Sequence, residues 1–310
     1  MFWFYYESEK GITVDELLSK KEKKQTDIAN LSASRRLLKQ YGLRAKKSLG
    51  QNFLVDQTVA QRIVEAVDIS PDDYVFEIGP GLGALSQLLA QKTNNLALVE
   101  IDPQLAKLLS DSFAGCGNVE VIREDALRFD FAEHVTKKGF ANYKLVSNLP
   151  YYITTPLLMH ILEKGGSWQR LVLMVQKEVA ERITATPGGK AYGALTLAVQ
   201  YRAQAELLLN VPSSAFLPQP EVESAVIRLD RLVQPPVTTD ELTFFRVVAA
   251  AFGKRRKTLA NALTNSDLGK DKVFWQEAFT ACSIDGQRRG ETLSIEEFAM
   301  LANWLQKESL

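Results

Sequence analysis

Apolar residues recur at two different spacings along the first two thirds of the chain. Three segments show helical periodicity, at residues 59–67, 84–91 and 103–113. Short, mainly apolar runs lie before, between and after them, as strands buried on both faces do. The runs occupy residues 74–78, 96–99, 119–122, 143–146 and 171–175. Strands separated by helices predict a parallel, doubly wound α/β sheet.

The pattern changes after residue 200. The apolar segments 205–211 and 224–229 are joined by a proline-rich loop without a helix, so we expect two final strands that are neighbours in the sheet, one of them antiparallel. Helical periodicity returns beyond the proline-containing linker at residues 234–236. The chain is therefore expected to comprise a flexible N-terminal extension (1–34), an α/β domain with a basic N-terminal arm (35–233) and a small all-helical domain (237–310).

The overall charge gives no support to nucleic-acid binding, because 37 basic and 37 acidic residues cancel. Two cysteines and two histidines, all widely spaced, predict neither a disulfide framework nor a metal site and favour a cytoplasmic protein. No apolar stretch approaches the length needed to cross a bilayer, and no membrane partner is expected.

Basic residues are nevertheless clustered along the sequence. No acidic residue occurs between Ile28 and Val55, whereas six basic residues do, and the segments 254–257 and 288–289 are basic throughout. Such clusters are either solvated helix faces or phosphate-contacting surfaces. Their segregation in a chain of zero net charge favours RNA as a partner.

A glycine-rich loop follows the predicted strand 74–78 and precedes a predicted helix. Glycines at positions 79, 81 and 83 let a ligand approach the backbone, and a helix N-terminus would add partial positive charge. The spacing departs from the dinucleotide fingerprint, which favours a nucleotide-containing cofactor without a pyrophosphate. A plain tight turn is the alternative.

Carboxylates end the next two predicted strands. Glu100 can accept hydrogen bonds from ribose hydroxyls, and Asp125 can accept from an adenine amino group. Asp102 is better explained as the N-cap of the following helix. Solvent exposure is the alternative for Asp125, but ligands of open α/β sheets bind at this end of the strands.

Asn148-Leu149-Pro150-Tyr151 follows the predicted strand 143–146. The amine of adenine is a weak nucleophile, because its lone pair is delocalised into the ring. The Asn148 side-chain oxygen and the Leu149 carbonyl can accept its two hydrogens and favour a more tetrahedral nitrogen. Pro150 would fix the turn, and Tyr151 would offer a face for the base.

Phe216 lies in the loop 212–220, where prolines flank it. A rigidly held aromatic ring can cover the second face of a splayed-out base. Packing in the core is the alternative for this side chain.

Together these motifs closely resemble those of the ribosomal RNA adenine dimethyltransferases, in particular the small-subunit methyltransferase A group. The resemblance covers the chain from Arg35 to its C-terminus. Besides the glycine loop and residues 148–151, it rests on the segments 47–54, 222–229, 250–259 and 291–298.

The resemblance implies a Rossmann-like methyltransferase sheet with a small helical C-terminal domain and S-adenosylmethionine as the cofactor. It also implies two adjacent adenosines near the 3′ end of 16S rRNA, in the small ribosomal subunit or its precursor, as a substrate that becomes dimethylated at N6. A monomer is expected. The predicted cofactor-binding residues are Gln51, Asn52, Leu54, Gly79, Gly81, Glu100, Ile101, Asp125, Ala126 and Asn148. The predicted RNA-binding residues are Arg44, Lys46, Lys47, Lys254, Arg255, Arg256 and Lys257.

Three other interpretations compete with this one. Erythromycin-resistance methylases modify large-subunit RNA, but more often carry Ile at the position of Leu149 and lack the basic helix at 255–259. A noncatalytic RNA-binding relative would not need the intact motif at 148–151. A nicotinamide dehydrogenase would need a hydride-transfer acid or base, and nothing in the sequence resembles one.

Overall fold

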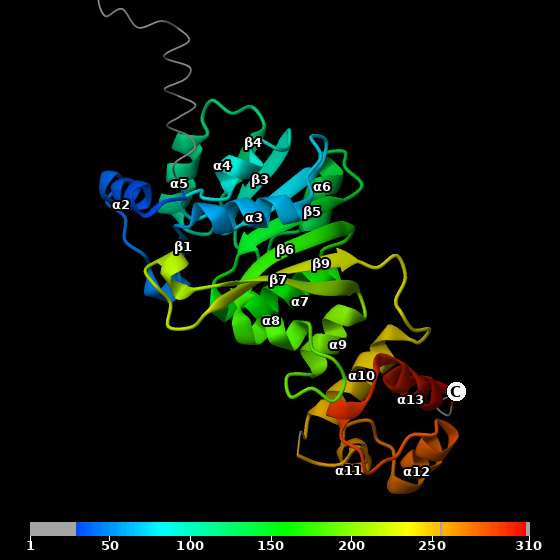
Figure 1. The fold of residues 1–310 in the computed structure, drawn as a ribbon. Coiled ribbons are helices and arrows are strands. Elements are labelled where there is room, and N and C mark those ends of the chain that lie inside the picture. The colour runs from blue at the N-terminus through cyan, green and yellow to red at the C-terminus, as the bar shows by residue number, and fades with distance from the viewer. Residues whose placement is uncertain (1–28, 255, 308–310) are drawn as a thin grey trace, which may run out of the picture.

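The computed structural model describes residues 29–254 and 256–307 (Figure 1). A seven-stranded sheet forms its centre, with the order β4-β3-β2-β5-β6-β9-β7. The strands from β4 to β6 in this order run parallel, and β9 is antiparallel to both β6 and β7. The predicted α/β class and the antiparallel final strand are confirmed. The strands are β2 (Tyr74–Ile78), β3 (Asn95–Val99), β4 (Val119–Ile122), β5 (Tyr143–Asn148), β6 (Trp168–Gln176), β7 (Ala203–Val211) and β9 (Ser224–Arg231).

Helices cover both faces of this sheet (Figure 1). Successive side chains of β2 point to opposite layers: Val75 packs with the helices α3 to α5, and Phe76 packs with α6 to α8. Both layers are apolar, which explains why the strand sequences show no alternation. The helices are α3 (Gln57–Val67), α4 (Ser86–Leu89), α5 (Pro103–Ser112), α6 (Phe131–Lys137), α7 (Thr154–Lys164), α8 (Lys177–Ile183) and α9 (Ala194–Gln200).

Aspartate side chains cap the start of several helices. The Asp102 carboxylate accepts from the backbone N–H of Gln104 at 3.0 Å, which confirms its predicted role at the start of α5. Asp56 caps α3 and Asp130 caps α6 in the same way. These caps fix where the chain turns from strand or loop into helix.

The C-terminal part is helical throughout, as predicted, and residues 232–240 before it contain neither helix nor strand. Its core is shared with the region of α9, because Tyr192, Leu197 and Tyr201 pack in the same apolar cluster. The proposed division at residues 234–236 therefore separates two units that are packed together. The helices are α10 (Glu241–Phe252), α11 (Leu259–Thr264), α12 (Lys272–Ala281) and α13 (Ile295–Lys307), with the 3-10 turn η4 (Gly290–Thr292).

The segment before α3 also has regular structure. Helix α2 (Leu31–Gln40) begins at its N-cap Asn30 and crosses the proposed boundary between residues 34 and 35. The turn η1 (Lys47–Leu49) follows, and then β1 (Phe53–Leu54) pairs with β8 (Phe216–Leu217) next to η3 (Ser213–Ala215). This small sheet ties the N-terminal segment to the loop before β9. The expected flexibility of residues 1–28 lies outside the described residues.

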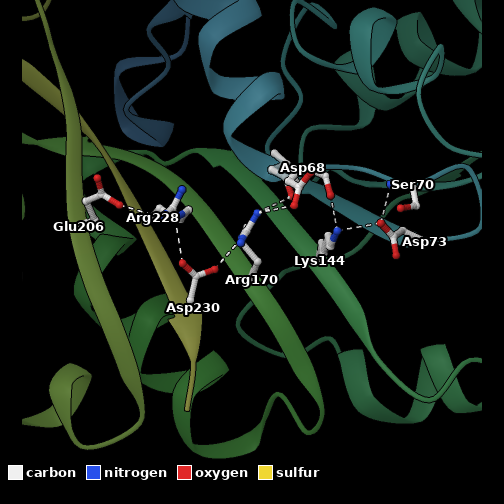
Figure 2. Close-up of polar contacts among 9 residues, drawn as sticks. Asp68, Ser70, Asp73, Lys144, Arg170, Glu206, Arg228 and Asp230 are labelled. Atoms are coloured by element: carbon white, nitrogen blue, oxygen red, sulfur yellow. Dashed lines mark hydrogen bonds and ion pairs between the residues drawn. The ribbon is translucent and has the colours of Figure 1, made fainter. Parts of the chain in front are cut away.

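Charged side chains form a continuous network at the amino ends of the parallel strands (Figure 2). Arg170 on β6 pairs with Asp68 and with Asp230 on β9, and Arg228 joins Asp230 to Glu206 on β7. The network links the antiparallel strands to the parallel part of the sheet. It lies at the opposite end of the strands from the site described next.

Candidate active site

A cavity of about 210 Å³ opens at the carboxyl ends of β2, β3 and β5. Residues 49–54, called the covering segment below, lie along one side of the cavity, and the turn η2 (Tyr151–Ile153) lies along another. Its lining includes all ten predicted cofactor-binding residues and the predicted catalytic residues Asn148, Leu149, Pro150 and Tyr151. Phe216 is not part of the lining. The sheet thus brings together residues that are up to 104 positions apart, from Leu49 to Ile153.

The glycine loop approaches the cavity with its backbone. Gly79 and Gly81 have φ angles of 62° and 59°, which L side chains rarely adopt. A Cβ on Gly81 would also lie only 3.1 Å from the Phe53 ring. Helix α4 begins as late as Ser86, so the loop itself, and not a helix N-terminus as expected, faces the ligand space.

Two carboxylates are buried beside this loop. Glu100 is 4% exposed and accepts from the backbone N–H of Asp102 at 2.9 Å and of Gly81 at 3.3 Å. Burial raises the pKa of Glu100 to about 7. Glu77, which was not among the predicted site residues, accepts from Ser86 Oγ at 2.6 Å, and burial raises the pKa of Glu77 to about 8. A carboxylate within the apolar run 74–78 was the signal that could have identified it.

The other predicted nucleotide ligand, Asp125, is partly exposed. Its Oδ1 accepts from the Leu127 backbone N–H at 3.0 Å, which holds the carboxylate in a turn at the end of β4. Ala126 beside it is buried and lines the cavity. The second carboxylate oxygen lies 3.9 Å from Nε of the exposed Arg128, which is beyond hydrogen-bond distance, so it can still accept from a ligand amine.

Asp102 anchors the segment that covers the cavity. Its carboxylate, 2% exposed, lies 2.8 Å from Lys46 Nζ and accepts from Gln51 Nε2 at 3.1 Å. Burial would raise the pKa of Asp102, but the hydrogen bonds from Lys46, Gln104 and Gln51 outweigh it and hold the pKa below its usual value. Lys46, predicted to contact RNA, forms this ion pair within the protein, and its side chain is still 38% exposed.

Asn148 is oriented by the covering segment. Its Nδ2 donates to the Asn52 carbonyl at 3.0 Å, and Asn52 Nδ2 donates to the Gly50 carbonyl at 3.2 Å. Since the amide nitrogen is engaged, Oδ1 is the free acceptor, and none of the described residues donates to it. The Tyr151 hydroxyl lies 2.7 Å from Ser224 Oγ, and burial raises the pKa of Tyr151. An acceptor and a fixed aromatic ring therefore meet at the end of β5.

Phe216 departs from its expected position. Phe216 is 2% exposed and packs in the same apolar cluster as Phe53 and Leu54, and Leu54 is also its β-bridge partner. Both faces of the ring are covered, which leaves none for a base in this conformation. The structure matches the core-packing alternative.

The chain is similar to known proteins over most of its length. Residues 42–307 match the family described as ribosomal RNA adenine dimethylase. The chain belongs to this family. The fold class, the enzyme class and the resemblance found in the sequence are thereby confirmed.

Two relatives of this dimethylase are similar to it over nearly their whole length. The ribosomal RNA small subunit methyltransferase A of Alkaliphilus oremlandii (strain OhILAs) is 46% identical over 283 residues, 91% of this chain and 99% of the relative. The protein of the same name from Geobacillus kaustophilus (strain HTA426) is 45% identical over 284 residues, 90% and 97% of the two chains.

Two solved structures share the fold of the dimethylase. A dimethyladenosine transferase from Plasmodium falciparum superimposes with a TM-score of 0.70 at 23% identity, covering 83% of this chain and 98% of that one. The 23S rRNA methyltransferase ErmE reaches 0.65 at 25% identity, covering 82% and 100%.

The remaining predicted RNA-binding residues of the dimethylase lie on its surface. Arg44 and Lys47 near the cavity, and Lys254, Arg256 and Lys257 after α10, are exposed. Arg255 lies outside the described residues. Arg288 differs from its neighbour Arg289, because it forms a bidentate pair with Glu297 that raises the pKa of Arg288.

Two further properties concern the described residues alone. No group of three or more His, Cys, Asp or Glu side chains is placed to hold a metal ion within residues 29–254 and 256–307. The helices of this part of the dimethylase are too short or too polar to span a membrane.

Proposed function

We propose that this dimethylase transfers methyl groups from S-adenosylmethionine to N6 of two adjacent adenosines near the 3′ end of 16S rRNA. The products would be N6,N6-dimethyladenosines, and the reaction would serve small-subunit biogenesis. The observation that carries the proposal is the Asn148 amide, which presents a free acceptor to the cavity at the end of β5. The relatives at 45–46% identity are named ribosomal RNA small subunit methyltransferase A, which supports the small subunit as the target.

The cavity residues fit S-adenosylmethionine. Glu100 would accept from the ribose hydroxyls, Asp125 from the adenine amine, and Ile101 would pack against the adenine. Gly79 and Gly81 leave room for the ligand beside the backbone, and Asn52 and Leu54 would close over the methionine end. When bound, the cofactor supplies a sulfonium methyl group that is already strongly electrophilic.

The protein's own contribution is to hold the adenine amine. Asn148 Oδ1 and the Leu149 carbonyl would accept the amine hydrogens, and Tyr151 would support the ring. No strong general base is needed for this role. Neither histidine lines the cavity: His134 contacts the Tyr74 hydroxyl, and His160 contacts the Phe129 carbonyl.

A label-transfer experiment tests the proposal. The parent protein and Asn148→Ala are incubated with S-adenosylmethionine labelled in its methyl group and with small or large ribosomal subunits that lack the modification. We expect the parent protein to transfer label to small subunits but not to large ones. Asn148→Ala should transfer label to neither. Label in large subunits would favour the ErmE-like activity, and label in neither would favour a noncatalytic RNA-binding relative.

A further inference from the structure

Tyr152 has an unusual position at the mouth of the cavity. It follows Tyr151 in the turn η2, lines the cavity and is 56% exposed. No other Phe, Tyr or Trp among the described residues is as exposed. No described residue forms a hydrogen bond with its hydroxyl. The ring is therefore a solvent-facing apolar surface without a role in the packing of the core.

The position of the ring is nevertheless fixed from one side. Its Cδ1 and Cε1 atoms lie 3.2 Å and 3.5 Å from where a Cβ on Gly50 would be, and Pro150 Cβ lies at 3.5 Å from the same point. Gly50 itself has a φ of 58° and closes the turn η1 with a hydrogen bond to the Lys47 carbonyl at 3.0 Å. One part of the ring thus contacts the covering segment, and the rest faces outward.

Two basic residues precede Gly50, the position that the ring contacts. Lys47 begins the turn that Tyr152 contacts, and Arg44 precedes it by three positions. Both are exposed, and neither forms an ion pair with another described residue, in contrast to Lys46. An aromatic face next to free cations binds single-stranded nucleic acid by base stacking and phosphate contact.

We propose that Tyr152 stacks on the base adjacent to the adenosine that occupies the cavity, and that Lys47 contacts the phosphate chain there. The inference rests on the proposed function, in which two neighbouring adenosines are modified. A base that enters the cavity leaves its neighbour without a stacking partner on one side. The Tyr152 ring replaces that partner, whereas Tyr151, which is tied to Ser224, supports the base inside.

Steady-state kinetics on unmodified small subunits test this assignment. Tyr152→Ala and Tyr152→Phe are compared with the parent on subunits that carry both adenosines and on subunits in which one of them is replaced by uridine. For Tyr152→Ala we expect KM to rise about tenfold on the first substrate, in the range of one aromatic–base stack. On the uridine substrates the rise should be about threefold or less, because a pyrimidine stacks more weakly. Tyr152→Phe should behave as the parent.

Leu242→Ala, which removes another exposed apolar side chain (72%) on α10, is the matched control and should leave KM unchanged. Cofactor affinity and melting temperature should be the same in all variants. An equal rise in KM on both kinds of subunit, or no rise, overturns the stacking role, as does a loss of cofactor affinity in Tyr152→Ala. If the parent protein methylates none of the small subunits, the proposed function fails and the inference fails with it.

Discussion

At the scale of single residues, the site depends on polar groups whose environment sets their chemistry. Glu100 accepts two backbone hydrogen bonds in a buried position, so it is held at the cavity although its charge is disfavoured there. Asn148 is turned by the Asn52 carbonyl so that its oxygen is the free atom. Each of these arrangements leads to a measurable consequence.

Glu100→Ala should weaken the binding of S-adenosylmethionine by about 1–3 kcal/mol, since the ribose hydroxyls lose their acceptor. The pKa of Glu100 is raised to about 7, so the carboxylate is protonated below that pH and charged above it. The charged form accepts better, and parent affinity should therefore fall as the pH drops from 8 to 6. Calorimetry measures both effects, with Glu100→Gln as the control that should lose the pH dependence. Unchanged affinity in Glu100→Ala would refute the assignment.

Asn148→Ala should lose most of the methylation rate, by roughly 100-fold or more, as expected for removing a group that polarises the reacting atom. RNA binding should persist, because the exposed basic residues are untouched. Single-turnover rates and subunit binding separate the two quantities. A variant that retains the parent's rate would show that Asn148 only packs against the covering segment.

At the scale of elements, the cavity depends on a short N-terminal segment held at two points. Lys46 and Gln51 bind Asp102 at the start of α5, and β1 pairs with β8. The sequence predicted the strand ends that carry Gly79, Glu100, Asp125 and Asn148, because buried strands leave continuous apolar runs. It could not predict β1 and β8, which have two residues each and pair across more than 160 positions.

Breaking the first anchor should loosen the covering segment. Lys46→Met is expected to weaken cofactor binding by about 1 kcal/mol, a modest value because the lysine is partly exposed. Lys46→Met should have little effect on the salt dependence of RNA binding. Lys47→Met should instead reduce that salt dependence and leave cofactor affinity unchanged. Calorimetry and subunit titrations on the two neighbouring variants distinguish anchoring from phosphate contact. If Lys46→Met reduced the salt dependence of RNA binding and left cofactor affinity unchanged, Lys46 would be a phosphate contact and not an anchor of the covering segment.

Breaking the second anchor should cost stability. Phe216→Ala removes a ring that is 2% exposed and should lower the free energy of unfolding by about 3–5 kcal/mol. Phe216→Leu, which keeps most of the apolar volume, should lose much less. Urea unfolding measures both. Parent-like stability in Phe216→Ala, together with accumulation of monomethyladenosine, would instead support the base-stacking role expected from the sequence.

At the scale of the whole molecule, the net charge is zero, but the basic residues differ in whether an acidic side chain pairs with them. Acidic side chains neutralise several basic ones, as in Lys46–Asp102 and Arg288–Glu297, whereas the basic residues after α10 stay exposed. The sequence located these clusters but could not tell Arg288 from Arg289, because the partner of Arg288 is fixed by the folding of α13. The distinction needs the three-dimensional structure.

Arg256→Glu combined with Lys257→Glu should weaken small-subunit binding and flatten its dependence on salt, because fewer counterions are released. Cofactor affinity should not change, since neither residue lines the cavity. Lys272→Glu, an exposed lysine at the start of α12, is the single-charge comparison. Identical salt slopes for the double variant and the parent would identify the cluster as a solvated face.

Mass spectrometry of the modified RNA tests the central claim most directly. Small subunits lacking the modification are incubated to completion with the parent protein and S-adenosylmethionine, and the 16S rRNA is then cut into fragments and sequenced by mass. Two N6,N6-dimethyladenosines at adjacent positions near the 3′ end, and no other new methyl groups, are predicted. A single modified adenosine, methylation elsewhere in the rRNA, or unmodified RNA would contradict the account.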